Sequence, residues 1–178
     1  HLGHALSALL NADMARAVGG RLILRIEDID TTRCRPAFET AIYEDLAWLG
    51  LEWEQPVRRQ SEHLGEYAAD LARLDDRTLL YPCFCTRREI DTALVAPHGP
   101  EGAVYPGTCR DLAAAERSAR IAAGRPFARR LDLTRALAAA GPLSFVESGT
   151  RVPVDARRLQ AEIGDVVLAR KDVPASDH

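Results

Sequence analysis

The sequence predicts an α/β fold that is interrupted by a small cysteine-bearing insertion. Apolar residues recur at helical spacing in residues 3–18 and again in residues 36–49, with a short apolar run between them. Residues 83–109 contain three of the four cysteines among clustered glycines and prolines, which is typical of a loop-rich segment. Strand-like runs then return. We therefore expect the first half of an α/β domain in residues 1–81, an insertion in residues 82–124, and the continuation of the domain in residues 125–178.

The first half reads as alternating helix and strand. The helix over residues 3–18 stops at a glycine pair, and the apolar run at residues 21–26 predicts a buried strand. Together they make half of a βαβ unit, whose first strand we expect before residue 1. A second helix over residues 36–49 begins at a proline, and a third begins near Ser61.

The second half of the chain alternates in the same way. Strands are expected in residues 78–84, 127–133, 143–147 and 165–170, and a helix in residues 111–123. Thr86 and Glu89 have the spacing of a capping box, which predicts that a short helix begins there.

Composition and charge narrow the class of protein. Hydrophobic residues make up 47% and charged residues 28%, as in globular proteins, and no run reaches the roughly 20 apolar residues needed to cross a membrane. The net charge of -3 does not by itself indicate a nucleic-acid binder, although a basic face can coexist with an acidic total. No basic-then-apolar leader is visible. We expect a cytoplasmic monomer that does not associate with membranes.

The first four residues, His-Leu-Gly-His, stand at the head of a helix. The free N–H groups and positive dipole end of a helix attract phosphate, and Gly3 has no side chain to keep a ligand away. His1 and His4 are three residues apart, so both could donate hydrogen bonds to one anion and stabilise charge that develops at phosphorus. On spacing alone, two structural or incidental histidines remain the alternative.

An acidic stretch directly follows the first predicted strand. Open α/β sheets bind ligands beyond the ends of their strands, and a carboxylate there can pair with an α-ammonium group. Glu27, Asp28 and Asp30 are the candidates. For Asp28 and Asp30 we favour a structural role, as helix caps or as ion-pair partners. The arginines near enough in the sequence for such pairs are Arg25, Arg33 and Arg35.

Cys83, Cys85 and Cys109 predict a metal site. In a cytosolic protein, clustered cysteines favour metal binding or catalysis over disulfides. Structural zinc takes four ligands in a closed tetrahedron, and His98 in the intervening loop is the simplest chemical candidate for the fourth. Three reduced, buried thiols without a metal are the alternative. Cys34 has no partner at ligand spacing and reads as a packed thiol.

Several motifs together resemble one family of enzymes. These are "HLGH", "GGRLILRIEDIDTTR", "AIYEDLAWLGLEWE" and "CFCTRREI". They resemble the catalytic domain of the class I glutamyl-tRNA synthetases and of their shortened relatives, the glutamyl-Q tRNA(Asp) synthetases. The resemblance is clearest in residues 1–90 and 150–174. It implies a Rossmann-type class I synthetase catalytic domain with a small zinc-binding insertion.

The resemblance implies roles for the residues at the front of the chain. His1, Leu2, Gly3 and His4 are this sequence's form of the HIGH signature, which binds ATP. Glu27 corresponds to the carboxylate that holds the amino group of bound glutamate.

The resemblance also implies a fourth zinc ligand. Glutamyl-Q tRNA(Asp) synthetases carry Cys-x-Cys followed by Tyr-x-x-x-Cys, with the tyrosine oxygen on the metal, which carries over to Tyr105 and Cys109. Zinc-bearing bacterial glutamyl-tRNA synthetases place a histidine two residues after the last cysteine, where this chain has Asp111. We therefore prefer Tyr105 to His98. The expected zinc is structural, because four protein ligands leave no open position.

The activity that the resemblance implies depends on ATP and Mg²⁺. L-Glutamate is activated as glutamyl-adenylate, and the glutamyl group passes to queuosine in the anticodon loop of tRNA-Asp. One alternative is a glutamyl-tRNA synthetase that charges the tRNA 3′ end, and another is a non-enzymatic zinc module that binds RNA. The family's first strand and its Lys-rich KMSKS-type loop are not found in this sequence, so we expect the 178 residues to form part of an active site.

Overall fold

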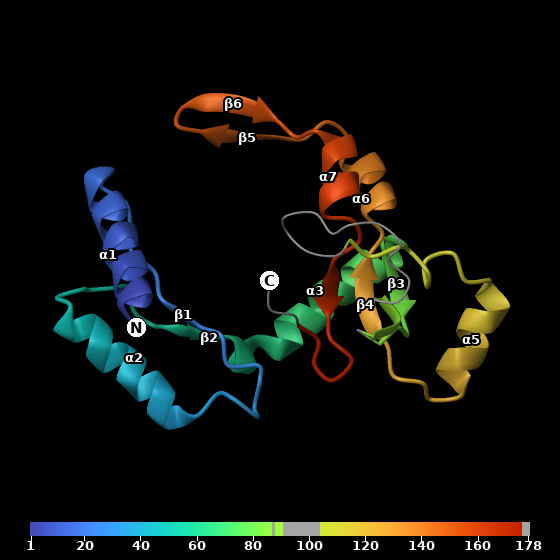
Figure 1. The fold of residues 1–178 in the computed structure, drawn as a ribbon, viewed down its shortest axis with the longest axis horizontal. Coiled ribbons are helices and arrows are strands. Elements are labelled where there is room, and N and C mark those ends of the chain that lie inside the picture. Colours follow the sequence, from blue (N-terminus) through green and yellow to red (C-terminus); the bar gives the residue numbers. More distant parts are fainter. Residues whose placement is uncertain (87, 91–103, 176–178) are drawn as a thin grey trace. The chain divides into compact units, whose positions relative to one another are not determined.

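The computed structural model describes residues 1–86, 88–90 and 104–175. The chain divides into two compact units, an N-terminal unit (His1–Gly65) and a C-terminal unit (Glu66–Ser176) (Figure 1). Each unit is described separately below. No described helix is both long and apolar enough to cross a membrane.

The N-terminal unit is a small βαβ arrangement that is preceded by a helix. Its elements are α1 (Leu2–Ala17), β1 (Arg25–Ile26), α2 (Pro36–Trp48), β2 (Arg58–Arg59) and a 3-10 turn, η1 (Gln60–His63). β1 and β2 pair in parallel, with α2 as the connection between them. The strand expected over residues 21–26 is shorter than predicted, because strand pairing begins only at Arg25; before it, the Leu22 carbonyl accepts a single hydrogen bond from the Glu54 amide.

Local signals in the sequence set the helix ends of this unit. α1 lies within one residue of its predicted range, and Gly19 after it has a positive φ of 60°. Pro36 is the first residue of α2, and Gly50 beyond its end has a φ of 72°. Glycine adopts this left-handed conformation without steric cost, which explains why each helix stops there.

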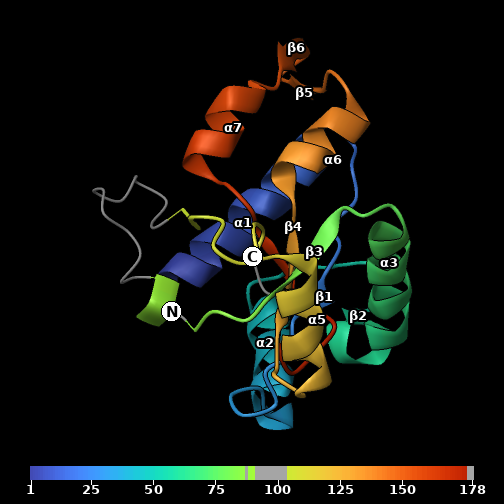
Figure 2. The ribbon, with the colours of Figure 1, turned by 90° about the vertical axis from the view of Figure 1, so that its right-hand side faces the viewer.

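The C-terminal unit is built on a three-stranded antiparallel sheet. The helix α3 (Leu64–Asp76) leads into it, and its strands are β3 (Leu80–Cys83), β4 (Ala128–Leu131) and β7 (Val167–Ala169), with β4 in the middle. The remaining elements are α5 (Ala114–Ala122), α6 (Leu133–Ala140), the hairpin strands β5 (Ser144–Glu147) and β6 (Thr150–Pro153), and α7 (Ala156–Glu162). Figure 2 shows α6 and α7 side by side beyond one end of the sheet. The predicted strands and helix of this half all occur, each inside its expected range.

Three elements of the C-terminal unit were not predicted: α6, β6 and α7. Both helices are short, and each begins at an aspartate whose carboxylate caps the first turn. Asp132 accepts from the Arg135 amide, and Asp155 accepts from the amides of Arg157 and Arg158. These N-caps were the available signal.

The core of the C-terminal unit contains cysteines in place of the usual branched side chains. Its buried cluster consists of Tyr81, Cys83, Phe84, Tyr105 and Cys109. Phe84 packs edge-on against Phe127, with 5.7 Å between the ring centroids. Two of the three predicted thiols, Cys83 and Cys109, and the predicted tyrosine therefore lie in this buried cluster, and Cys85 is partly buried against it.

Candidate functional site

Four predicted ligand atoms converge at one point of the C-terminal unit. The thiol sulfurs of Cys83, Cys85 and Cys109 lie within 4.8 Å of one another, and Cys85 Sγ is 3.4 Å from Cys109 Sγ. The hydroxyl oxygen of Tyr105 is 3.5 Å from Cys83 Sγ and 3.6 Å from Cys85 Sγ. Two segments that are about twenty residues apart in the sequence thus bring three sulfurs and one oxygen together.

Two short backbone segments position these side chains. Cys83 ends β3, and Cys85 follows two residues later. The second segment is a turn in which the Arg110 amide donates to the Gly107 carbonyl, and Gly107 has a φ of 83°. This turn folds Cys109 back onto Tyr105, and the Cys109 amide donates to the Tyr105 hydroxyl oxygen at 2.8 Å.

The two segments are also joined by a hydrogen bond. The Phe84 amide donates to Cys109 Sγ at 3.3 Å. A backbone N–H directed at sulfur is the contact expected for a thiolate, because it stabilises negative charge.

Burial governs the acidity of this cluster. It raises the pKa of the Cys85 thiol to about 11 and raises the pKa of the Tyr105 phenol above its usual value, with hydrogen bonding to neighbouring thiols as a further cause for Tyr105. Burial also opposes ionisation of Cys109, but hydrogen bonds from Tyr105 and from the Phe84 amide outweigh it and lower the pKa of that thiol. Cys109 is the group that these contacts prepare best to carry negative charge, whereas Cys85 and Tyr105 need a cation nearby to ionise at neutral pH.

The donor set fits a four-coordinate ion. With Zn–S of about 2.3 Å and Zn–O of about 2.0 Å, a regular tetrahedron places sulfurs about 3.8 Å apart and sulfur about 3.5 Å from oxygen. The Tyr105 oxygen lies at about the expected sulfur–oxygen separation from the sulfurs of Cys83 and Cys85. The sulfurs of Cys85 and Cys109 are slightly closer together than the expected sulfur–sulfur separation. Cys83, Cys85, Cys109 and Tyr105 could therefore hold a metal. His98, the competing candidate, lies outside the described residues.

Cys34 is separate from this group, as expected. It lies in the N-terminal unit, where its sulfur is 3.6 Å from the Glu27 carbonyl oxygen.

The two histidines of the first motif lie on the same side of the start of α1. Their ring centroids are 5.2 Å apart. His1 is the N-cap, and its Nδ1 accepts a hydrogen bond of 3.2 Å from the Gly3 amide. That amide is therefore already bound, which differs from the expectation of a free N–H at this position. A side chain at residue 3 would lie 3.3 Å from the same imidazole nitrogen, so glycine makes room for the cap.

A cavity of about 490 Å³ opens beside this motif, within the N-terminal unit. It is lined by His1, Leu2, His4 and Ala5 at the start of α1 and by Ile42, Asp45, Leu46, Trp48 and Leu49 toward the end of α2. The histidine pair thus faces a space of the size that small ligands occupy, with apolar walls.

The acidic residues after β1 have distinct partners. The carboxylate of Glu27 forms an exposed ion pair with Arg25. Asp28 accepts from the amide and hydroxyl of Ser61 at 2.8 and 2.6 Å. Asp30 caps its own turn through the Thr32 amide and hydroxyl.

The favoured structural roles of Asp28 and Asp30 are therefore observed, with one change of partner. Asp30 is 3.6 Å from Arg33, one of the arginines considered from the sequence. The cation beside Asp28 is Arg59 at 3.4 Å, which is too distant in the sequence to have been considered. Glu27 remains the accessible carboxylate of the three.

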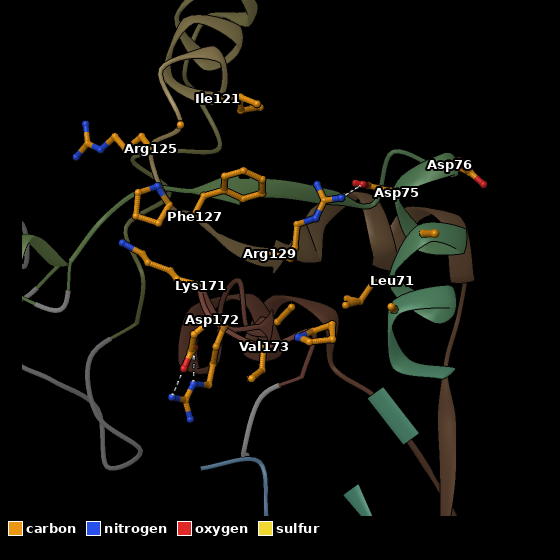
Figure 3. A pocket seen from close by; sticks show the side chains of 17 residues that line it. Leu71, Asp75, Asp76, Ile121, Arg125, Phe127, Arg129, Lys171, Asp172 and Val173 are labelled. Carbon is orange, nitrogen blue, oxygen red and sulfur yellow. Dashed lines mark hydrogen bonds and ion pairs between the residues drawn. The ribbon is translucent and has the colours of Figure 1, made fainter. Parts of the chain in front are cut away.

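A second and larger hollow, of about 660 Å³, lies in the C-terminal unit (Figure 3). Arg125, Phe127 and Lys171 line one side of it, and Arg129 forms an ion pair with Asp75 of α3 on the other. No motif in the sequence predicts this hollow. Its cations contact protein groups, as Lys171 donates to the Phe84 carbonyl at 3.1 Å, and we assign it no ligand.

Comparison with known proteins gives a consistent result. The family model described as tRNA synthetases class I (E and Q), catalytic domain, matches residues 1–140. A protein of Rhodobacter capsulatus named glutamyl-Q tRNA(Asp) synthetase is 43% identical over the whole chain, which spans 65% of it. The protein of that name from Nocardia farcinica is 50% identical over 76% of the chain, which spans 42% of it. A glutamate–tRNA ligase 2 of Nitrosococcus oceani is 36% identical over 97% of the chain and 37% of its own length.

Solved structures agree with the fold. A glutamate tRNA ligase from Elizabethkingia meningosepticum, with 24% sequence identity, superposes with a TM-score of 0.67 over 99% of this chain and 37% of its own. At this level of identity the likeness shows the α/β fold of a class I synthetase catalytic domain.

Proposed function

Because the chain belongs to the class I tRNA synthetases (E and Q) through their catalytic domain, we propose that it activates glutamate with ATP and transfers the glutamyl group to queuosine in the anticodon loop of tRNA-Asp. The observation that carries the proposal is the identity of 43–50% with relatives named glutamyl-Q tRNA(Asp) synthetase. The chain spans two thirds of these relatives or less, so the proposal concerns the full-length protein.

The proposed reaction has two displacement steps. An oxygen of the glutamate α-carboxylate attacks the α-phosphorus of ATP, and the bond to pyrophosphate breaks to give glutamyl-adenylate and pyrophosphate. A nucleophile of the RNA acceptor then attacks the carbonyl carbon, and AMP leaves with the electrons of the broken bond. Mg²⁺ accompanies ATP as its usual counter-ion.

In this proposal, the residues at the start of the chain act on phosphate charge. His4 and the exposed edge of His1 donate hydrogen bonds to phosphate oxygens beside the apolar cavity, where donors stabilise the charge of a transition state more than in water. Glu27 receives the α-ammonium group of glutamate in place of its present ion pair with Arg25. That exchange replaces one charge-assisted contact by another.

The proposal also includes a zinc ion that is held by Cys83, Cys85, Cys109 and Tyr105. The support is the convergence of the four ligand atoms and the backbone N–H groups of Phe84 and Cys109 directed at two of them. With four protein ligands, the ion has a structural role and ties the end of β3 to the turn at Gly107.

Two assays test the proposed function with the full-length protein. Given ATP, Mg²⁺ and glutamate, it should exchange labelled pyrophosphate into ATP without tRNA. It should then transfer labelled glutamate to queuosine-containing tRNA-Asp, and transfer should fail with tRNA-Asp that lacks queuosine.

The same assays separate the alternatives. Charging of tRNA-Glu at its 3′ end would identify a glutamyl-tRNA synthetase, the reading that the similarity to glutamate–tRNA ligase 2 favours. If the folded protein catalyses neither pyrophosphate exchange nor glutamyl transfer, the enzyme proposal is contradicted, and the RNA-binding zinc module remains as the alternative.

A further inference from the structure

One arginine lies directly on the ring of the tyrosine in the candidate metal site. The guanidinium carbon of Arg130 is 3.9 Å from the centroid of the Tyr105 ring. Arg130 comes from the central strand β4, and its Nη1 donates to the Asp165 carbonyl at 2.6 Å. The residue is partly buried, and its Nε is buried without a hydrogen-bond partner among the described residues.

The surroundings hold this arginine but do not neutralise it. Within the described part of the chain, Arg130 has no ion pair with a carboxylate. The carboxylate of Asp165, the residue whose carbonyl Arg130 binds, is 3% exposed and is already satisfied. It accepts from Tyr81 at 2.6 Å, from Arg110 at 3.0 Å and from the Leu133 amide at 2.9 Å. The positive charge of Arg130 is thus directed at the Tyr105 ring.

A filled metal site would need such a charge. Three thiolates and one phenolate around a dication leave a net charge of about −2 in a buried place. Buried charge is costly unless it is paired. Of the other cations near the cluster, Arg110 is paired with the carboxylates of Asp165 and Asp111. Lys171 donates to the Phe84 carbonyl, and Arg120 and Arg125 lie over the Phe84 ring, so Arg130 is the cation that contacts the tyrosine ring among the described residues.

We propose that Arg130 is a positioning residue for metal binding, whose guanidinium fixes the ring of Tyr105 and stabilises the negative oxygen that this side chain presents to the ion. The inference rests on the proposed zinc site. A cation over the face of an aromatic ring is attracted to it, most strongly when both groups are removed from water. Ionisation of the ring oxygen increases the electron density of the ring and strengthens that attraction.

The role differs from simple packing, and one substitution separates the two. Tyr105→Phe retains the ring, and therefore any stacking of Arg130 on it, but removes the oxygen. If Arg130 acts on the charged oxygen, its replacement should weaken zinc binding only while that oxygen is present. A double-mutant cycle measures this coupling.

The experiment measures zinc affinity by chelator competition in the full-length protein and in Arg130→Met, Tyr105→Phe and the double variant. We expect Arg130→Met to weaken binding about tenfold, a loss typical of outer-shell partners of metal ligands, and to have little further effect in the Tyr105→Phe background. The tyrosinate absorption band that appears on zinc binding should also shrink or shift in Arg130→Met. Arg130→Gln serves as a second uncharged variant if circular dichroism shows that Arg130→Met does not fold.

Arg129→Met is the matched control. It lies next to Arg130 on β4, but its guanidinium pairs with Asp75 and contacts the Phe127 ring. We expect its zinc affinity to equal that of the unchanged protein.

The outcomes are distinct. If Arg130→Met lowers the zinc affinity equally with and without the Tyr105 oxygen, Arg130 is only a packing residue. That result would overturn this inference and leave the proposed zinc site intact. An unchanged affinity would do the same. If the unchanged protein binds no zinc, both the metal site and the inference fail, while pyrophosphate exchange would still test the enzyme proposal separately.

Discussion

At the scale of single residues, the first motif combines two roles that the sequence could not separate. His1 caps α1 through Nδ1, and His4 lies beside it with an exposed ring. The cap is structural, so replacing His1 would disturb the helix start as well as any chemistry. His4 makes no such contact to the backbone with its ring among the described residues. It is therefore the cleaner residue to test.

We predict that His4→Ala lowers the rate of pyrophosphate exchange by roughly 10²-fold while ATP binding changes much less. A hydrogen bond that acts on charge in the transition state affects the rate more than ground-state affinity. Steady-state kinetics with separate kcat and KM for ATP measures the difference. An unchanged kcat would show that the histidine pair is incidental.

Tyr105 is the second residue whose role can be tested singly. We predict that Tyr105→Phe weakens zinc binding by at least about tenfold, and that Cys109→Ser abolishes stoichiometric binding, because each loses one of four ligands. His98→Ala should retain the affinity of the unchanged protein. Elemental analysis and chelator competition supply the measurements, and the reverse ranking of Tyr105 and His98 would give the fourth position to the histidine.

At the scale of elements, the sequence predicted most where the signal was local. Pro36 begins α2, and the capping box of Thr86 and Glu89 forms as expected, with the Thr86 amide 2.6 Å from the glutamate carboxylate and the Glu89 amide 3.2 Å from the threonine hydroxyl. The helices α6 and α7 were missed because they are short and because each lies between two segments that were predicted to be strands. Their capping aspartates and their runs of good helix formers are the signals that distinguish them from loop.

One contact between elements should control the pH dependence of stability. The Asp28 carboxylate connects the end of β1 to η1 by its two hydrogen bonds from Ser61, and its side chain is 11% exposed. Burial disfavours its charged form, but the Ser61 hydrogen bonds and the Arg59 charge outweigh burial and lower the pKa of Asp28. A lowered pKa in the folded state means that the contact stabilises above the usual carboxyl pKa and is lost as the pH falls through the lowered value.

We predict that Asp28→Asn reduces the free energy of unfolding by about 1–3 kcal/mol at pH 7, the usual cost of losing hydrogen bonds to a charged group. The difference from the unchanged protein should shrink as the pH falls below about 4. Urea unfolding at pH values from 7 to 2.5 measures it, with Glu52→Gln as an exposed carboxyl control. A difference that stays constant across this range would show that charge is not the source of the stabilisation.

At the scale of the whole molecule, the contacts that matter most join residues far apart in the sequence. Cys109 reaches the Phe84 amide across 25 residues, and Tyr81 reaches Asp165 across 84. Spacing could suggest Cys83, Cys85 and Cys109 as a set, and resemblance could add Tyr105, but neither could place Arg130 over the tyrosine ring. That contact depends on the register of β4 beside β3, which pairs Tyr81 with Arg130. Register depends on which face of each strand is buried and on the connections between strands, and β3 and β4 are too far apart in the sequence for a short turn to reveal it.

The division into two units gives a prediction for metal removal. All four candidate ligands belong to the C-terminal unit. We predict that chelation of zinc lowers the melting temperature of this unit by roughly 10 °C, because a tightly bound ion stabilises the state that binds it. Hydrogen exchange should increase at β3 and at the turn from Tyr105 to Cys109, while α1 and α2 retain their protection. A uniform increase over both units would contradict the assignment of the metal to one of them.

The convergence of two short segments on one point has a consequence for chain entropy. Cys85 and Tyr105 are twenty positions apart, so an ion bound between them closes a loop as a disulfide would. The entropic cost of closing a flexible loop grows only with the logarithm of its length, and doubling the length adds about 0.6 kcal/mol. Insertions and deletions between Cys85 and Tyr105 should therefore have little effect on the proposed metal site. Within each pair, by contrast, the end of β3 and the turn at Gly107 position both ligand atoms, so a change in the spacing of Cys83 to Cys85 or of Tyr105 to Cys109 would move a ligand away from the ion.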